Sequence, residues 1–254
     1  MSLIKNYNGA LYKHLKIHAA WLPVVNTIRL GDYGLMDGGV FRTLGNIENL
    51  KVKFSQRVGQ TAPIDFQSKG TTVARFIGDV KVDKLPEVGD VAARLVYSFS
   101  KGDSCLIRAA LSVQVMADVD AVAKKLGQLD DWKTRFRVVC GVYTGEKCVI
   151  LTTEEANTSV EFAGSASALT QIELGRVEIK PSISVSSESV FKSVGATGVV
   201  GLQLFKLNWK WFGGGAKFLA APTKSKPRRS PAVCWPTRSN PLPVPDPVPV
   251  PVPE

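Results

Sequence analysis

Histidine is nearly absent from the sequence, which has only His14 and His18 among 254 residues. A Ser-His-Asp or Cys-His nucleophile would have to use one of these two side chains. They are four residues apart on a predicted helix, a spacing that suits a metal, but no third ligand and no HExxH glutamate accompanies them. We therefore predict no catalytic residue, no metal site and no cofactor site.

Nucleotide-binding motifs and long apolar runs are also lacking. Neither a Walker A motif nor GxGxxG occurs, and the glycine-rich stretch 213–217 lacks the Ser or Thr of a phosphate cradle. The neighbouring carboxylates at 130–131 and 154–155 would point to opposite faces of a strand, which is unsuited to paired acid–base work. No run reaches the ~18 apolar residues of a membrane-spanning helix, and no secretion signal is recognised at the start. We expect a non-enzymatic, cytoplasmic protein.

Cysteine is scarce, with four residues at positions 105, 140, 148 and 234. Their spacing contains no CxxC pair, by which zinc sites usually announce themselves. Cys140 and Cys148 fall on neighbouring apolar segments and could approach each other across a hairpin. Without an export signal, free buried thiols are the expected state.

Basic residues outnumber acidic ones, 32 to 22, which gives a formal net charge of +10. This balance would suit a nucleic acid. No recognition motif is present, however, and the basic residues are scattered among acids. Nucleic acid is therefore not an expected partner.

Proline is concentrated at the end of the chain. Residues 222–254 hold 11 of the 15 prolines, ending in PLPVPDPVPVPVPE. Because proline fixes φ and lacks a backbone donor, this segment is predicted to be disordered or polyproline II. The chain thus divides into one globular domain, 1–221, and a tail, 222–254, that is first basic and then proline-rich. The tail is either a solvated terminus or a ligand for an SH3-like groove, which it would contact through Pro241, Pro243, Pro245 and Pro247.

Apolar periodicity within 1–221 predicts a β-rich α+β fold: a twisted mixed or antiparallel sheet with long hairpins and a few short helices. Asp37-Gly38 is a hairpin-turn signal. Helices are predicted at 8–20 and 118–126. Strands are predicted at 24–30, 71–77, 92–100, 105–115, 135–143, 147–153, 158–163, 173–186 and 199–211, with 135–143 and 147–153 forming a tight hairpin.

Two predicted hairpins, 92–115 and 158–186, are long and amphipathic. A strand of ~9–11 alternating residues can cross a bilayer if its edges close into a barrel. An ordinary long twisted sheet has the same pattern. The membrane hypothesis requires that these stretches can leave their sheet. If both were clamped on each edge under covering helices, a plain sheet-rich adaptor would be the better interpretation.

The order of the predicted elements resembles the pore-forming domain of gasdermins. It runs from a basic helix through WLPVVNTI, a long amphipathic hairpin and a helix to RFRVVCGVYTGEKCVILTT, a second amphipathic segment and the strand GVVGLQLFKL. The resemblance covers 1–207 in element order more than in identities, and is strongest over 111–152. Bacterial gasdermins carry a lipid-modified Cys near the start, whereas the first Cys here is Cys105.

The resemblance implies a cytoplasmic protein that is inactive until triggered and then inserts hairpins into an anionic membrane as a self-oligomer. The tail would act like the short inhibitory peptide of bacterial gasdermins. The expected lipid contacts are Lys5, Lys13, Lys16, Ile107, Leu111, Val113, Val177 and Ile179. The alternative is a soluble, non-enzymatic binding or scaffold protein whose proline-rich tail recognises a protein partner.

Overall fold

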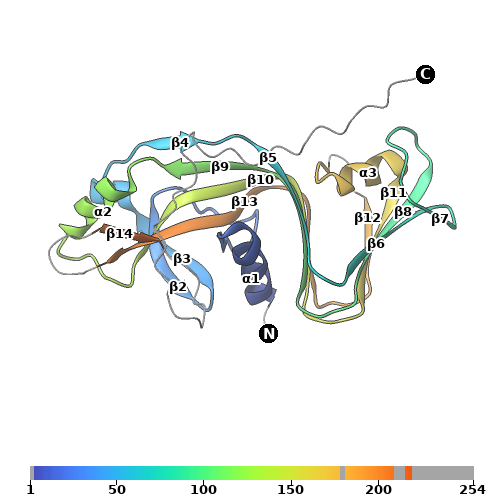
Figure 1. Ribbon diagram of the computed structural model, residues 1–254, viewed down its shortest axis with the longest axis horizontal. Coiled ribbons are helices and arrows are strands. Elements are labelled where there is room, and N and C mark those ends of the chain that lie inside the picture. The colour runs from blue at the N-terminus through green and yellow to red at the C-terminus, as the bar shows by residue number, and fades with distance from the viewer. Residues whose placement is uncertain (1–2, 178–180, 209–214, 219–254) are drawn as a thin grey trace, which may run out of the picture. The chain divides into compact units, whose positions relative to one another are not determined.

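The computed structural model describes residues 3–177, 181–208 and 215–218 (Figure 1). All of them belong to one compact unit, Met1–Ala221. Two antiparallel sheets, one of nine strands and one of five, dominate this unit. The predicted β-rich α+β fold is therefore confirmed. The described helices are short: α1 (Leu3–Leu15), the 3₁₀ helix η1 (Ile47–Leu50), α2 (Val119–Gly127) and α3 (Ala166–Glu173).

The nine-stranded sheet is built around four strands in the spatial order β5-β9-β10-β13. These strands are β5 (Ala62–Gln67), β9 (Ser104–Met116), β10 (Arg137–Thr153) and β13 (Val190–Asn208). Shorter strands complete it: β4 (Gln56–Val58) pairs with β9, the hairpin of β2 (Asp32–Asp37) and β3 (Val40–Asn46) with β10, and both β1 (His18–Ala19) and β14 (Gly215–Phe218) with β13.

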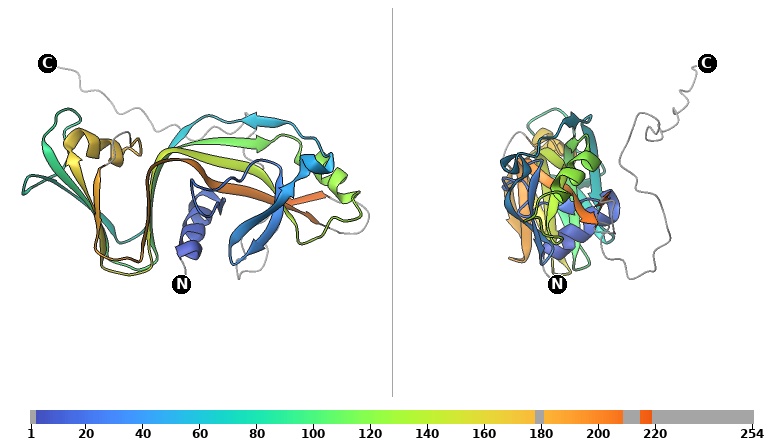
Figure 2. Two further views of the ribbon diagram at one scale, coloured as in Figure 1. Left: turned by 180° about the vertical axis from the view of Figure 1, so that it is seen from behind. Right: turned by 90° about the vertical axis from the view of Figure 1, so that its left-hand side faces the viewer.

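The five-stranded sheet has the order β12-β11-β8-β6-β7. Its strands are β12 (Ser182–Val185), β11 (Thr158–Ser165), β8 (Ala92–Phe99), β6 (Thr71–Ile77) and β7 (Val80–Val82). It faces the bent part of the nine-stranded sheet, and α3 lies beside it at the open end between the two sheets (Figures 1 and 2). The two sheets share one apolar core, because Leu106, Val149 and Leu151 pack with the residues of β8, β11 and α3.

Helix α1 covers the other face of the bent sheet (Figure 1). Tyr7 and Leu11 are almost fully buried in one core with Ile107, Ile150 and Val200. The Tyr7 hydroxyl donates a hydrogen bond of 3.1 Å to the Val200 carbonyl oxygen. The central strands are thus covered on both faces, which explains the continuous apolar runs in the sequence.

The glycine-rich segment 31–47 forms the β2–β3 hairpin. Its two-residue loop is Gly38-Gly39, with φ values of 58° and 91°, the left-handed backbone that this turn needs. The predicted turn at Asp37-Gly38 is confirmed. Gly45 has a different role: a Cβ there would lie 3.1 Å from the Tyr33 ring, so its absence lets that ring lie across the strand.

The predicted long hairpin 92–115 is wrong in its pairing, whereas the arms of the predicted hairpin 158–186 do pair with each other, as β11 with β12. β8 does not pair with β9, because the connection 100–103 sends β9 into the other sheet. The tight hairpin predicted around Thr144-Gly145-Glu146 is a single strand, β10, paired along both edges with a bulge before Cys148. Glycine is needed at 145 because a Cβ would collide with the Cys148 sulfur.

The predictions for 8–20 and 24–30 also need correction. Helix α1 ends at Leu15, since Lys16 takes a φ of 58° and the next residues pair with β13. Residues 24–30 form no strand, because the Asn26 amide donates to the carbonyls of Leu22 and Val199 and holds a turn there. Among the described residues of the predicted arm 173–186, a strand forms over Ser182–Val185 alone, after α3. The predicted helix at 118–126 is confirmed as α2.

Candidate functional site

Four short connections join the two sheets, and we call them the four corners: 68–70, 100–103, 154–157 and 186–189. They join β5 to β6, β8 to β9, β10 to β11, and β12 to β13. The order β5-β9-β10-β13 in one sheet is therefore repeated as β6-β8-β11-β12 in the other. All four corners lie at one level, at the turn near the bottom of Figure 1. The two layers are one four-stranded sheet folded over on itself.

The two central strands keep a single register through this fold. Ser104 pairs with Thr153 on one side of the corners, and Phe99 pairs with Thr158 on the other. Four residues separate the two pairs on either strand, 100–103 and 154–157. Straightening both corners would therefore continue the same ladder without a slip.

The corners are made by left-handed residues and short polar side chains. Gly70, Asp103 and Asn157 have φ values of 90°, 58° and 58°. Asn, Asp and Gly are the residues that adopt this backbone with little strain. Thr153 and Thr158 flank the third corner, and the buried hydroxyl of Thr158 donates a hydrogen bond of 3.1 Å to the hydroxyl of Thr153.

The replacement Asn157→Val should destabilise the folded-over state. A β-branched residue at a φ of 58° costs about 1–2 kcal/mol of folding free energy. Because the Asn157 side chain is exposed, its replacement should remove no buried contacts, and the measured change should reflect backbone strain. Urea unfolding measures the change. The matched control Asn157→Gly should lie within about 0.5 kcal/mol of the parent, and equal loss in both variants would contradict this role of the corner.

The inner face of the five-stranded sheet is apolar. It carries side chains that the nine-stranded sheet and α3 bury almost completely: Leu95, Tyr97, Phe99, Val160 and Phe162. The outer face of the same strands carries Arg94, Ser98, Ser159 and Glu161, which are more exposed. Each of these strands is therefore amphipathic, with the period of two that a lipid-facing strand also needs.

A charged cluster lies in the otherwise apolar interface between the layers. Glu173 at the end of α3 accepts hydrogen bonds from the Arg75 guanidinium, the shortest being 2.6 Å from Nη2 to Oε1. Arg108 of β9, only 9% exposed in its side chain, lies 3.9 Å from Glu173 and donates to Asp65 and to the Tyr97 hydroxyl at 2.9 Å. The hydrogen bond with Glu173 raises the pKa of Arg75, and burial raises the pKa of Tyr97. This cluster ties both layers and α3 together.

Three strands of the two predicted hairpins are clamped by neighbours, whereas the fourth, β12, lies at the edge of the five-stranded sheet. β8, β9 and β11 are each paired along both edges, and α3 covers the inner face of the five-stranded sheet. The β11–β12 hairpin could leave the sheet only by breaking the ladder between β11 and β8. A movement that keeps all ladders intact would have to carry β6, β8, β11 and β12 as one layer.

The structure places the predicted apolar lipid contacts in two different cores. Ile107 and Leu111 are buried in the core that α1 covers, and Val113 is half-buried. Val177 is buried between the two layers, and Ile179 lies outside the described residues. The sequence analysis did not identify the inner-face residues of β8 and β11 as candidate lipid contacts. The alternation of apolar and polar residues over 92–100 could have indicated those of β8.

The predicted basic contacts are all exposed. Lys5, Lys13 and Lys16 lie on or directly after α1, away from the buried Tyr7 and Leu11. The Lys16 ammonium lies 5.6 Å from the centre of the Tyr12 ring and donates to the Lys13 carbonyl oxygen.

Replacing Lys5, Lys13 and Lys16 together by Gln should weaken binding to anionic vesicles. Each lysine near such a surface contributes about 1 kcal/mol, so the expected loss is on the order of 100-fold at low salt. Vesicle co-sedimentation measures it. A triple variant of the exposed Lys53, Lys124 and Lys125 removes the same charge elsewhere, and an equal loss in that control would show that only net charge matters.

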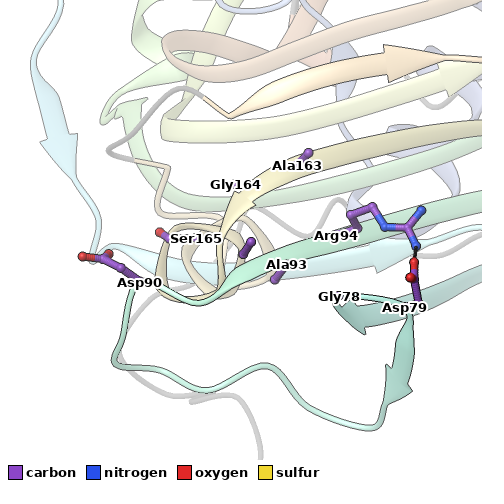
Figure 3. A pocket seen from close by; sticks show the side chains of 9 residues that line it. Gly78, Asp79, Asp90, Ala93, Arg94, Ala163, Gly164 and Ser165 are labelled. Carbon is purple, nitrogen blue, oxygen red and sulfur yellow. Dashed lines mark ion pairs between the residues drawn. The ribbon is translucent and has the colours of Figure 1, made fainter.

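One hollow of the described region contains no set of side chains arranged for catalysis. This hollow, of about 640 Å³, lies at the ends of β8 and β11 away from the corners and is lined mainly by glycine and alanine (Figure 3). Its ion pair, Arg94–Asp79 at 3.5 Å, is exposed. The described side chains contain no group of three metal ligands, and within the described ranges no helix is long and apolar enough to cross a membrane.

Three cysteines lie within the described part of the chain. Cys105, Cys140 and Cys148 are buried and form no disulfide among the described residues, as predicted, and Cys234 lies outside this part. Burial raises the pKa of both Cys105 and Cys148 to about 12. Cys140 and Cys148 are eight residues apart on one strand rather than facing across a hairpin. The predicted tail contacts Pro241, Pro243, Pro245 and Pro247 also lie outside the described residues.

Comparison with known proteins gives a weak likeness of fold. No protein-family profile and no curated protein matches the chain. A solved structure of a bacterial gasdermin from Bradyrhizobium tropiciagri is similar over 84% of this chain and 91% of its own, with 16% identity and a TM-score of 0.40. At that score the likeness is a weak resemblance of fold.

Proposed function

We propose that this protein is a non-enzymatic, gasdermin-like pore former. It remains cytoplasmic until triggered and then inserts amphipathic strands into an anionic membrane as an oligomer. One observation carries the proposal: the layer of β6, β8, β11 and β12 repeats the strand order of the sheet onto which it folds. Opening at the four corners would convert two stacked layers into one sheet of long strands. This movement leaves the ladders within the layer intact.

The chemistry of the inner face supports such a conversion. Side-chain direction alternates along a strand, so straightening the four-residue corners would place Leu95 and Phe99 on the face of Ile107. Phe162 would likewise lie on the face of Ile150, and the combined face would be largely apolar, with Arg75 of β6 as a charged residue on it. Exposing each large apolar side chain to water costs about 1.5–3 kcal/mol, so the layers stay closed in water. Lipid removes that cost.

The strand lengths fit a bilayer. β8 and β11 have eight residues each, and at ~3.3 Å per residue this gives about 26 Å. The corner residues would extend both strands beyond the ~9–11 residues that a tilted spanning strand needs. The polar outer face would then line water, and the exposed lysines of α1 would contact the anionic surface.

Dye release from vesicles tests the proposal. The intact chain and a chain trimmed after Ala221 are mixed with dye-loaded vesicles that contain anionic lipid, and with neutral vesicles as the control. We expect release from the anionic vesicles, faster for the trimmed chain if the tail restrains it. Absence of release with both chains would contradict pore formation and favour the scaffold protein.

A further inference from the structure

A second hollow has a volume of about 300 Å³ and is lined by residues of β2, η1 and the loop between α2 and β10. Strand β2 and helix α2 lie at the end of the nine-stranded sheet away from the folded-over layer (Figure 1). Three aromatic side chains form its walls: Tyr33, Trp132 and Phe136. Neither the pore proposal nor the strand pattern accounts for them.

The three rings form a compact triangle. The ring centres are 5.5 Å apart for Tyr33 and Trp132, 5.6 Å for Tyr33 and Phe136, and 5.4 Å for Trp132 and Phe136. The rings are mutually tilted, by 48°, 55° and 83°, and are not stacked. Because the centres are this close, one cation at the mouth can lie within the ~6 Å reach of all three rings.

Two carboxylates line the same hollow. Asp130 and Asp131 are exposed residues of the loop after α2, and Leu50 and Leu129 add apolar surface. Two adjacent carboxylates are too few oxygen ligands for a bare metal ion. They suit an organic cation, whose charge they balance while its apolar surface contacts rings and leucines.

The site is held by the fold. Tyr33 is fixed on β2 by pairing with Val138, and the missing Cβ of Gly45 makes room for its ring. Trp132 is 7% exposed, and its buried Nε1 has no hydrogen-bond partner in the described protein. Buried donors of this kind normally have partners, so this N–H is a polar group that a ligand could satisfy. Strand pairing and packing against the core hold the three rings in place before any ligand arrives.

We propose that this aromatic hollow binds a quaternary ammonium group of the choline type. Aromatic walls with nearby carboxylates are the chemistry that recognises methylated ammonium. A primary ammonium would keep its hydration and gain less from the rings and leucines. The group reaches the protein either as a free ion or as the headgroup of a choline lipid.

Choline chloride is the first probe, titrated into the full chain by calorimetry and by the NMR signal of the Trp132 indole N–H. The control is the neutral isostere in which carbon replaces the nitrogen of choline. We expect saturable choline binding that is at least about tenfold tighter than binding of the isostere. Equal affinity for both, or no binding of choline, would overturn the proposal.

Matched variants assign the binding to this hollow. Tyr33→Leu should weaken choline binding about tenfold, whereas Tyr33→Phe, which keeps the ring, should stay within about twofold. Phe136→Leu repeats the test if Tyr33→Leu does not fold. Asp130→Asn with Asp131→Asn should weaken binding severalfold at low salt, with less effect at high salt. Unchanged affinity in all of these folded variants would overturn the assignment.

Binding to phosphatidylcholine vesicles distinguishes the two possible sources of the choline group, a lipid headgroup and a free ion. Retention on them that Tyr33→Leu abolishes would identify a lipid headgroup, and binding of the free ion alone would identify a small-molecule ligand; either supports the site. None of these binding measurements depends on dye release. Their outcome therefore tests the choline site independently of pore formation.

Discussion

A disulfide that staples the third corner should abolish dye release. The side-chain oxygens of Thr153 and Thr158 are 3.1 Å apart and both residues are fully or nearly buried, so Thr153→Cys with Thr158→Cys places two sulfurs side by side. Straightening the corner would carry these positions to about 16 Å apart. A disulfide tolerates Cα separations only up to about 7 Å. The oxidised variant should therefore be inactive, and the reduced variant should release dye.

The reduced form of the same protein is the control, and Thr153→Ser with Thr158→Ser tests loss of the methyl groups alone. The native thiols at 105 and 148 are buried with raised pKa values, so they should not exchange with the new pair. Cys234 is replaced by Ser throughout. Equal release from oxidised and reduced forms would exclude opening at the corner.

Glu173→Ala should give the largest loss of stability among the single substitutions considered. It would leave Arg75 and Arg108 without their shared carboxylate in an interface where the Arg108 side chain is 9% exposed. Removing one partner of a buried ion pair costs about 3 kcal/mol, and urea unfolding measures it. Because the cluster joins both layers to α3, the variant should also release dye faster than the parent.

The exposed pair Arg42–Asp37, 2.8 Å apart with both side chains more than 60% exposed, supplies the control. Asp37→Ala should cost at most about 1 kcal/mol and leave dye release unchanged. Replacing Arg75, Arg108 and Glu173 together by Met should recover much of the stability, since apolar side chains of similar size tolerate this environment. Glu173→Ala with parental stability would show that the cluster does not hold the layers together.

Strands could in principle enter a membrane in two ways: a hairpin could peel from a sheet edge, or the folded-over layer could open at the corners. Peeling a hairpin from an edge would break ladders along β8 and β11, whereas opening the fold breaks only the corners and the packing between layers. Strands that change sheets at bends also occur in ordinary orthogonal sandwiches. The corner disulfide distinguishes these cases. It should not change the structure of a static sandwich, but it should prevent dye release if the sheet must straighten at the corners.

Several elements of the fold could be predicted because their sequence signals come from residues close together in the chain. The alternation in Cys105–Val115 and Ala92–Ser100 placed β9 and β8, and the acid-to-base gradient ending at Gly127 placed α2. The Asp37-Gly38 signal placed the β2–β3 turn. Each of these follows from side chains only a few residues apart.

The charged cluster could not be predicted in the same way. Arg108 lies on the less apolar face of the alternating segment that forms β9, but its partners Tyr97, Asp65 and Glu173 come from three other elements. The aromatic hollow is similar, since Tyr33 is about a hundred residues from Trp132. Only chain pairing brings these groups together.

For strands such as β8 and β9, the sequence by itself determined the strand segment and which side chains share a face, because side-chain direction in a strand alternates with a period of two. The tertiary structure decided which strands became neighbours. At 100–103 and 154–157 the backbone takes left-handed turns and each chain passes into a second layer. That choice depends on packing between Leu95, Phe162 and Leu151, contacts between residues far apart in the chain that no local pattern encodes.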